Sequence, residues 1–188
     1  MNRAAPALAI RTAAPDDTPA LERLIERSAR ALSRDHYSDV RIEAAITHVF
    51  GVDRELVADG SYFVADWDGG LAGCGGRSRR ATLFGGDRFA SRSSGALDSA
   101  RDAACIRAFF VSLDHARRGV GTALLAACED AARGAGFRRA TLMATLPGGP
   151  FYSAHGYVAE AQRSMIAAGS PVPFVMMSRI LLRKCNNQ

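Results

Sequence analysis

Apolar residues near the start of the chain recur at the spacing of one helix face, about three or four positions apart. The first set, after a cap at Asp17 or Thr18, is Leu21, Leu24, Ile25 and Leu32. The second set, after a cap at Ser38 or Asp39, is Ile42, Ile46, Val49 and Phe50. With a short strand-like run over residues 9–12 before them, these sets predict one strand followed by two helices.

A tight hairpin is predicted next. Residues 61–67 and 71–76 have strand composition and flank Asp68-Gly69-Gly70, whose glycines supply the positive φ that a tight turn requires. The following residues, 77–103, hold Gly85-Gly86 and a serine-rich stretch with few apolar anchors. A patternless segment of this length is uncommon inside a compact domain. We therefore expect either a functional loop over a cleft or a mobile insertion.

A strand, a helix and a second strand follow the insertion. Residues 104–111 form a β-rich run long enough for a central strand, and residues 138–146 alternate polar and apolar side chains. Between them, Gly119-Val120-Gly121 opens a helix that Gly134 and Gly136 end. This β-α-β unit predicts the centre of the sheet.

The C-terminal part predicts a short helix around residues 151–154 and two closing strands, 157–165 and 174–182. Together with the earlier elements they indicate an α/β (α+β) fold. The length of 188 residues suits one domain, residues 1–188, with the loop insertion at 77–103. The aliphatic last strand could pair across a homodimer interface, although burial within the sheet explains it equally well.

Composition excludes several classes of protein. No apolar run approaches the ~18 residues that a membrane-spanning helix needs, and Pro6 interrupts a start that lacks a secretory signal. The four cysteines show no metal-ligand spacing, so no metal is expected, and three of them have the apolar surroundings of buried reduced thiols. These features predict a cytoplasmic protein.

The positive charge is carried almost entirely by arginine. The chain has 24 basic and 19 acidic residues, and Lys184 is the only lysine. Genome base composition can produce this bias, but arginine is also the side chain that grips phosphate with a planar fork of donors. No block of like charge is present, so nucleic-acid binding is only weakly supported.

The helix start at Gly119 has the features of a pyrophosphate site. The first N–H groups of a helix have no intrahelical acceptor and lie at the positive end of its dipole. Glycines allow phosphates to approach the backbone, and Arg117 and Arg118 add charge. A dinucleotide fingerprint fits poorly because Leu124 stands where a small residue is needed. A glycine-containing helix start with exposed arginines remains the alternative.

The surrounding residues resemble a known family. The run from Val111 to Leu125 is similar to the acetyl-CoA signature of the GNAT N-acetyltransferase superfamily. At the family's expected distance, Pro150-Phe151-Tyr152-Ser153-Ala154-His155-Gly156-Tyr157 resembles its F-Y-x-x-x-G-[FY] segment. One departure is Ala116, which occupies the position where the family has arginine or glutamine.

The resemblance implies a mixed central sheet of about six to seven strands, flanked by helices, in which the fourth and fifth strands splay apart. The cofactor's pantetheine arm would lie in that gap, and acetyl-CoA is the implied cosubstrate. The residues implied to bind it are Phe109, Phe110, Val111, Arg117, Arg118, Gly119, Val120, Gly121, Thr122 and Phe151. The backbone cradle does not need the side chain missing at Ala116.

The same resemblance assigns two catalytic roles. The Val111 N–H would polarise the acetyl carbonyl, and Tyr152 would be the general acid, because a phenol stays protonated at neutral pH and can protonate a leaving thiolate. Many family members use a glutamate on the fourth strand, or a water chain, as base. Residues 106–111 hold no carboxylate, only Arg107. Other candidate bases are His36, Tyr37, His48, Asp102 and His155, and none is assigned.

The acceptor is expected to be a primary amine of a small molecule, peptide or protein. Its wall would come from residues 36–50 and from the insertion at 77–103, whose arginines could form a basic lid or a solvated loop. A different class of function stays open, namely a non-catalytic acyl-CoA-binding module that keeps the cofactor cradle. No membrane partner is expected.

Overall fold

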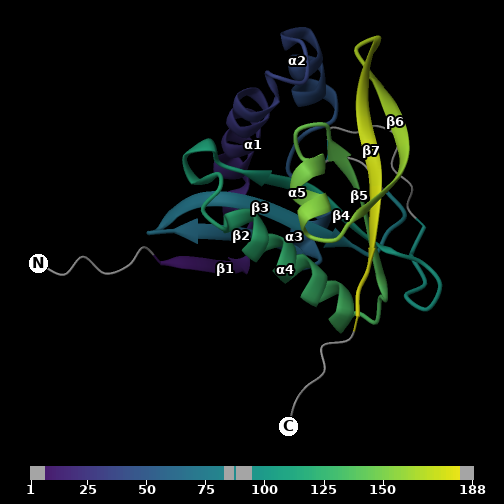
Figure 1. Cartoon of the computed structure of the whole chain (residues 1–188). Coiled ribbons are helices and arrows are strands. Elements are labelled where there is room, and N and C mark those ends of the chain that lie inside the picture. Colours follow the sequence, from purple (N-terminus) through teal and green to yellow (C-terminus); the bar gives the residue numbers. More distant parts are fainter. Residues whose placement is uncertain (1–6, 83–86, 88–94, 183–188) are drawn as a thin grey trace, which may run out of the picture.

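The computed structural model describes residues 7–82, 87 and 95–182 (Figure 1). The strands in these residues are β1 (Leu8–Thr12), β2 (Tyr62–Trp67), β3 (Gly70–Ser78), β4 (Ala104–Val111), β5 (Arg139–Thr145), β6 (Val158–Ala167) and β7 (Ser170–Ile180). The α-helices are α1 (Thr18–Ser33), α2 (Asp39–His48), α3 (Arg54–Ala58), α4 (Val120–Gly134) and α5 (Gly149–Ala154). The expected α/β architecture is confirmed, with one sheet of seven described strands in the order β1-β2-β3-β4-β5-β7-β6.

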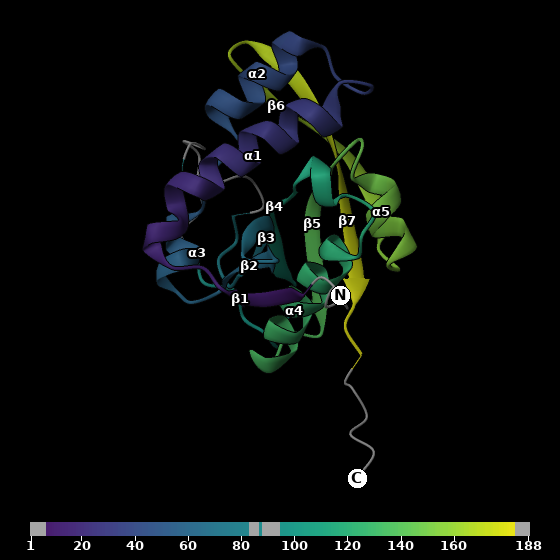
Figure 2. The ribbon, with the colours of Figure 1, turned by 90° about the vertical axis from the view of Figure 1, so that its left-hand side faces the viewer.

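Helices cover both faces of the sheet. The three N-terminal helices pack on one face, and α4 and α5 pack on the other. Figure 2 shows α1 and α2 above the strands and α4 below them. Because β4 and β5 are the parallel pair at the centre, their C-terminal ends open at the same edge as the start of α4. Ligands of open α/β sheets bind at such edges.

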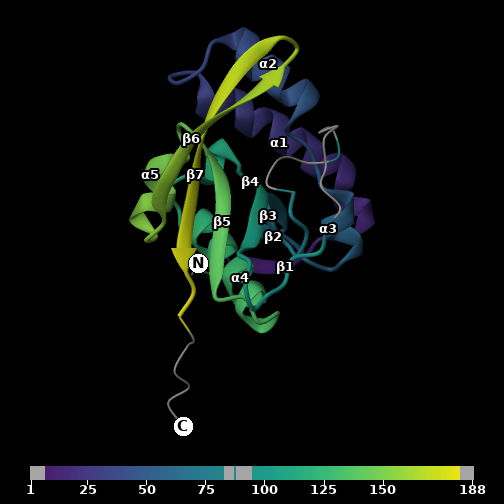
Figure 3. The ribbon, with the colours of Figure 1, turned by 90° about the vertical axis from the view of Figure 1, so that its right-hand side faces the viewer.

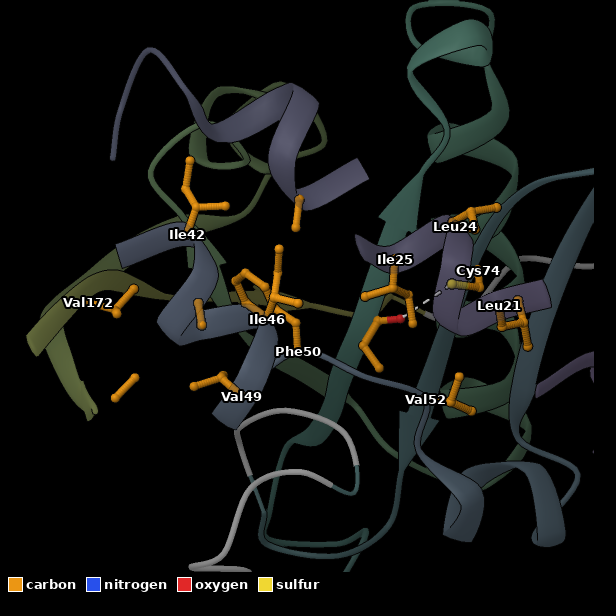
Figure 4. Packing of buried hydrophobic residues seen from close by; sticks show 14 of the residues in the cluster. Leu21, Leu24, Ile25, Ile42, Ile46, Val49, Phe50, Val52, Cys74 and Val172 are labelled. Carbon is orange, nitrogen blue, oxygen red and sulfur yellow. Dashed lines mark hydrogen bonds between the residues drawn. The ribbon is translucent and has the colours of Figure 1, made fainter. Parts of the chain in front are cut away.

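The larger apolar core lies under α1 and α2. Leu21, Leu24 and Ile25 of α1 point at the sheet around Cys74, as Figure 4 shows. In the same view, Ile42 and Ile46 of α2 approach Val172 of β7. The periodic residues that predicted these helices are therefore mostly the buried ones.

The hairpin of β6 and β7 extends beyond the rest of the sheet and reaches α2 (Figure 3). Tyr37, in the connection between α1 and α2, fastens this region. Its buried hydroxyl donates to the Pro173 carbonyl (2.8 Å) and accepts from the Leu146 N–H (2.8 Å). A single phenol thus ties the end of β5 to β7 and to the helical layer.

Several boundaries differ from the predicted ones. The short α3 was not predicted, because five residues are too few to show a helical period. The two closing strands are longer toward their shared turn than predicted, since they form a hairpin over 158–180. Within β7, Phe174 and Met177 are buried while Ile180 is exposed. Burial within the domain therefore explains the apolar residues at these buried positions of β7.

Part of the predicted insertion has regular structure. β3 runs on to Ser78, and Arg80 pairs with Ala96 in an antiparallel bridge that hydrogen bonds on both sides extend. The remaining residues of the segment, 83–86 and 88–94, lie outside the described residues.

The prediction of buried thiols is confirmed for Cys74, Cys105 and Cys128. Burial raises the pKa of Cys74 to about 12 and that of Cys105 to about 11. Cys185 is outside the described residues.

Candidate active site

The sheet opens between β4 and β5. These parallel strands pair only at Ala104–Ala140, Cys105–Thr141 and Ile106–Leu142. Beyond Ile106, β4 continues to Val111 without a partner on this side, while β5 stays paired with β7. A pocket of about 720 Å³ occupies the opening and extends to α1, α4 and α5.

A β-bulge marks the point where the strands separate. Cys74 faces Phe110 and Gly76 faces Arg107, so two residues of β4 stand opposite one residue of β3. One of them, Ala108, has a φ of 52°, which is uncommon for a residue other than glycine. The Tyr62 hydroxyl donates to its carbonyl at 2.9 Å and holds this conformation. The bulge changes the direction of the last residues of β4, beyond the point where β4 pairs with β5.

Val111 turns its backbone toward the opening. It faces Gly73, while the next residue, Ser112, donates its N–H to the Ala72 carbonyl at 2.8 Å. Hydrogen-bonded and non-hydrogen-bonded pairs alternate in antiparallel strands, so the N–H and C=O of Val111 point away from β3. The Val111 carbonyl accepts from the Ser28 hydroxyl of α1 at 2.7 Å. The N–H of the same residue points to the same side.

Gly75 makes room for an aromatic wall. A Cβ atom at this position would lie 2.4 Å from the Phe109 ring, well inside contact distance. Phe109 in turn lies 6.0 Å, between ring centroids, from both Phe151 and Tyr152. The glycine therefore lets Phe109 join these rings at the side of the pocket.

Replacing Gly75 with alanine is expected to destabilise the protein by about 1–3 kcal/mol, because Phe109 must move within a packed layer. The measurement is urea unfolding. Gly70→Ala in the same strand is the control, since its Cβ would meet only the Trp67 carbonyl, at an ordinary 3.6 Å. Equal unfolding midpoints for the two variants would contradict this account.

The loop before α4 forms the other end of the pocket. Arg117 (φ 64°) and Gly119 (φ 85°) both take the left-handed conformation, and α4 begins at Val120. The first intrahelical bond is donated by Ala123 to the Gly119 carbonyl, so the three N–H groups before it are available to a ligand. The sequence predicts a pyrophosphate site at this loop, which we call the cradle.

The predicted cofactor residues separate into two groups. Those that line the pocket are Phe109, Phe110, Val111, Arg117, Gly119, Gly121, Thr122 and Phe151. Two do not. Val120 is fully buried in the core, and the Arg118 guanidinium lies 6.0 Å from the centroid of the Trp67 ring. Only the backbone of Val120 can take part in the cradle.

His155 connects the cradle to α5. Its Nδ1 lies 2.8 Å from the Phe151 carbonyl, which only accepts, so Nδ1 carries the proton. Its Nε2 lies 3.0 Å from the Thr122 hydroxyl and forms a hydrogen bond with it. The imidazole also packs on the Phe151 ring, with centroids 4.4 Å apart. Sequence alone gave no sign of this bridge, because its partners lie 33 positions apart.

Tyr152 lies beside the opening between β4 and β5. It lines the pocket, yet only 8% of its surface is exposed. Burial raises the pKa of this phenol well above its ordinary value, with a smaller contribution from Cys128. The hydroxyl is thus protonated at neutral pH, as the general-acid prediction requires.

The candidate bases are not in the pocket. His36, His48 and Asp102 are exposed, and Tyr37 is committed to the two backbone groups described above. The described part of the chain contributes no Asp, Glu or His to the pocket lining. Its only charged members there are Arg107 and Arg117.

Arg107 lies on β4, a strand that holds no carboxylate. It is 1% exposed and lies 2.8 Å from the carboxylate of Asp53, which is fully buried. It also donates to the Thr82 carbonyl at 3.1 Å. This ion pair joins β4 to the start of α3, because Asp53 also caps that helix by accepting from Leu56 N–H.

The described arginines of the insertion do not line the pocket between β4 and β5. Arg77, Arg79, Arg80 and Arg101 are absent from the pocket lining. Arg80 instead binds Asp59, and Arg101 pairs with Asp98. Arg88 and Arg92 lie outside the described residues.

Fold and pocket together define an α/β protein whose sheet is opened between two parallel strands, with a helix N-terminus at the mouth of the pocket. Residues 19–157 match the family model of the acetyltransferase (GNAT) family. The chain belongs to the GNAT acetyltransferase family. A search of the curated proteins finds no match.

Solved structures share the fold. A GCN5-related N-acetyltransferase from Rhodopseudomonas palustris is 23% identical, with a TM-score of 0.69 over 96% of this chain and 99% of that one. The PaiA N-acetyltransferase of Thermoplasma acidophilum, solved with coenzyme A, is 16% identical, with a TM-score of 0.62 over 93% and 99%. The yncA protein of Salmonella typhimurium, solved with acetyl-CoA, is 16% identical, with a TM-score of 0.60 over 97% and 98%.

No helix in residues 7–82 or 95–182 combines the length and hydropathy needed to cross a bilayer. Nor do the described residues contain a group of three or more His, Cys, Asp or Glu side chains placed to hold a metal ion.

Proposed function

We propose that this protein transfers an acetyl group from acetyl-CoA to a primary amine by direct attack of the amine on the thioester. The observation that carries the proposal is the opening between β4 and β5, which joins a phosphate cradle, an inward-facing backbone N–H and a buried phenol in one pocket. When bound, acetyl-CoA supplies the activated acetyl group and a thiol leaving group.

The cradle fits the phosphates of such a cosubstrate. Three unbonded N–H groups at the start of α4 and the left-handed Gly119 leave the backbone open to an anion. Gly121 lets the Phe151 ring pack closely against the start of α4, since a Cβ there would lie 3.2 Å from that ring. Arg117 lines the same end of the pocket and adds a positive charge.

Two groups serve the reaction. The Val111 N–H donates to the acetyl oxygen and stabilises the negative charge that grows there as the amine nitrogen forms its bond to carbon. As the carbon–sulfur bond breaks, the Tyr152 hydroxyl donates its proton to the sulfur. The amine's own proton is lost to a group that we do not assign.

A thiol-release assay tests the function. With acetyl-CoA present, a panel of a monoamine, an amino acid, a peptide with a free N-terminus and a polyamine is expected to include an acceptor that releases thiol and gains an acetyl group by mass spectrometry. Tight coenzyme A binding without release on any amine would favour the alternative, a non-catalytic acyl-CoA-binding module. The absence of coenzyme A binding would contradict both.

Arg117→Met and Arg118→Met form a matched pair for the cradle. We expect Arg117→Met to weaken coenzyme A binding by roughly threefold to tenfold, because its side chain lines the pocket. Arg118→Met should change the affinity little, because Arg118 lies over Trp67. Isothermal titration calorimetry measures the coenzyme A affinity of both variants. A larger loss of affinity in Arg118→Met than in Arg117→Met would contradict the proposed role of Arg117.

A further inference from the structure

A second, smaller pocket lies at the opposite end of α4 from the cofactor cradle. It has a volume of about 250 Å³ and is bounded by Asp59, Ser61, Arg77, Arg79, Leu97, Ser99, Ala135 and Phe137. The 15 residues of α4 separate it from the cradle, a length of about 22 Å at ~1.5 Å per residue. It is therefore a different site from the proposed active site.

Arg77 reaches into this pocket with its hydrogen-bonding groups unused. The side chain is half-buried, and its guanidinium lies 6.0 Å from the centroid of the Phe137 ring. Its Nε is buried without a hydrogen-bond partner. In the described part of the chain no carboxylate lies within ion-pair distance of it. Burial lowers the pKa of Arg77, and the Arg79 charge adds to this effect.

The charges around Arg77 leave an excess of positive charge. Arg79 is exposed and lines the same pocket. The one carboxylate in the lining, Asp59, is already held by both terminal nitrogens of Arg80. Within the described residues, Arg77 and Arg79 thus line the pocket without an ion pair of their own.

A half-buried arginine with a buried, unbonded Nε loses hydration without compensation. An oxyanion in the pocket supplies the missing acceptor, and a planar guanidinium matches the geometry of phosphate oxygens. The Ser99 hydroxyl, also in the lining, offers a further donor. The Ser61 hydroxyl donates to the Leu56 carbonyl instead, at a long 3.4 Å.

We propose that this pocket binds the phosphate group of a small molecule through Arg77 and Arg79. The volume accommodates a phosphomonoester with a small organic body, or free phosphate. The site is separate from the cofactor phosphates and does not depend on the proposed transferase activity.

Phosphate titration of the ¹⁵N-labelled full chain, followed by amide NMR, tests the site. We expect saturable shifts of the Ser99, Gly136 and Phe137 amides with inorganic phosphate and with methyl phosphate. Shifts at the cofactor cradle are scored separately, since phosphate can also bind there. Titration with citrate as a third probe distinguishes a phosphate site from a carboxylate site.

The variants separate binding from packing. Arg77→Met should weaken phosphate binding by roughly tenfold or more, the loss expected for a charged hydrogen bond. Arg79→Met changes an exposed side chain and keeps the contact between Arg77 and Phe137, so it tests the site even if Arg77→Met fails to fold. Arg163→Met is the control, because Arg163 is exposed on β6.

Three outcomes overturn the proposal. The first is the absence of saturable shifts at Ser99, Gly136 and Phe137 with either phosphate. The second is an unchanged affinity in both Arg79→Met and a folded Arg77→Met. The third is binding of citrate alone. Loss of binding in the two pocket variants, with retention in Arg163→Met, supports it.

Discussion

Replacing Tyr152 with phenylalanine is expected to lower kcat at least roughly tenfold while coenzyme A affinity changes little. The variant keeps the ring and its contacts with Phe109, Phe151 and Tyr157, and removes only the hydroxyl. Within the described residues that hydroxyl has no side-chain hydrogen bond to lose, so the fold should tolerate the change. The step that slows is the release of the thiol, because its sulfur must then take a proton from another donor.

The raised pKa of Tyr152 defines the pH dependence of this effect. A phenol whose pKa lies above its ordinary value of about 10 keeps its proton through the neutral range. The same burial that raises the pKa of the phenol also raises the pKa of a thiol released next to it. The difference between the two pKa values, not the phenol pKa alone, therefore determines how favourable the proton transfer is. We therefore expect the deficit of Tyr152→Phe to stay nearly constant between about pH 6 and 9.

Tyr157→Phe is the matched control. Tyr157 lies 5.8 Å from Tyr152 between ring centroids, but its hydroxyl bonds to the buried Glu129 and it does not line the pocket. It should lose about 1 kcal/mol of stability and keep its kcat. An unchanged turnover of Tyr152→Phe across the pH range would remove the general-acid assignment.

Sequence periodicity predicted the long elements because their apolar faces are also their buried faces. Helices α1 and α4 follow from residues such as Leu21 and Leu124, both fully buried. The hairpin of β2 and β3 forms where Asp68-Gly69-Gly70 predicted it, although the positive φ lies at Asp68 and Gly69 and not at Gly70. Local chemistry and tertiary structure agree at these positions, so reading the sequence was sufficient.

The bulge in β4 could not be predicted in the same way. Ala108 has no local signal for a left-handed conformation, and its carbonyl is held by Tyr62, which lies 46 positions away. The sequence feature that relates to the bulge is Gly75, which lies opposite the bulge and against the Phe109 ring. A glycine within a strand indicates close approach but does not name the neighbour.

The candidate site was predicted in part. The resemblance to a family led to Tyr152 and to the glycine-bearing helix start, and the structure brings both to one pocket. The resemblance could not show that the Arg118 side chain turns to Trp67, because packing decides which way each of two neighbouring arginine side chains points. Nor could it show the bridge from Thr122 to His155, which depends on how α5 is placed.

The ion pair of Arg107 and Asp53 is the clearest example of a contact between distant residues that could not be predicted from the sequence. Both side chains are at most 1% exposed, and they join β4 to the helix α3 that was not predicted. Burying two charges is costly, and removing Asp53 leaves the Arg107 guanidinium only a more distant carboxylate, that of Glu55 at 3.9 Å. Arg107 also lines the pocket, so the pair couples the stability of this region to the shape of the pocket.

Asp53→Asn is accordingly expected to lower the free energy of unfolding by about 3–5 kcal/mol, measured by urea denaturation. The amide keeps an oxygen that can cap α3, so the loss reports the charge rather than the cap. Glu43→Gln is the control, because Glu43 pairs with Arg30 on the exposed surface, and its loss of stability should be much smaller.

The double variant Asp53→Asn/Arg107→Met completes the test. Since neither unpaired charge is then buried, its destabilisation should be smaller than the sum of the two single losses, and this non-additivity measures the coupling of the pair. Strictly additive losses, or an Asp53→Asn effect as small as that of Glu43→Gln, would show that the pair does not carry the stability of this region. A folded double variant also lets the acceptor KM be measured without the guanidinium, because Arg107 is the one charged side chain that the described part of β4 presents to the pocket.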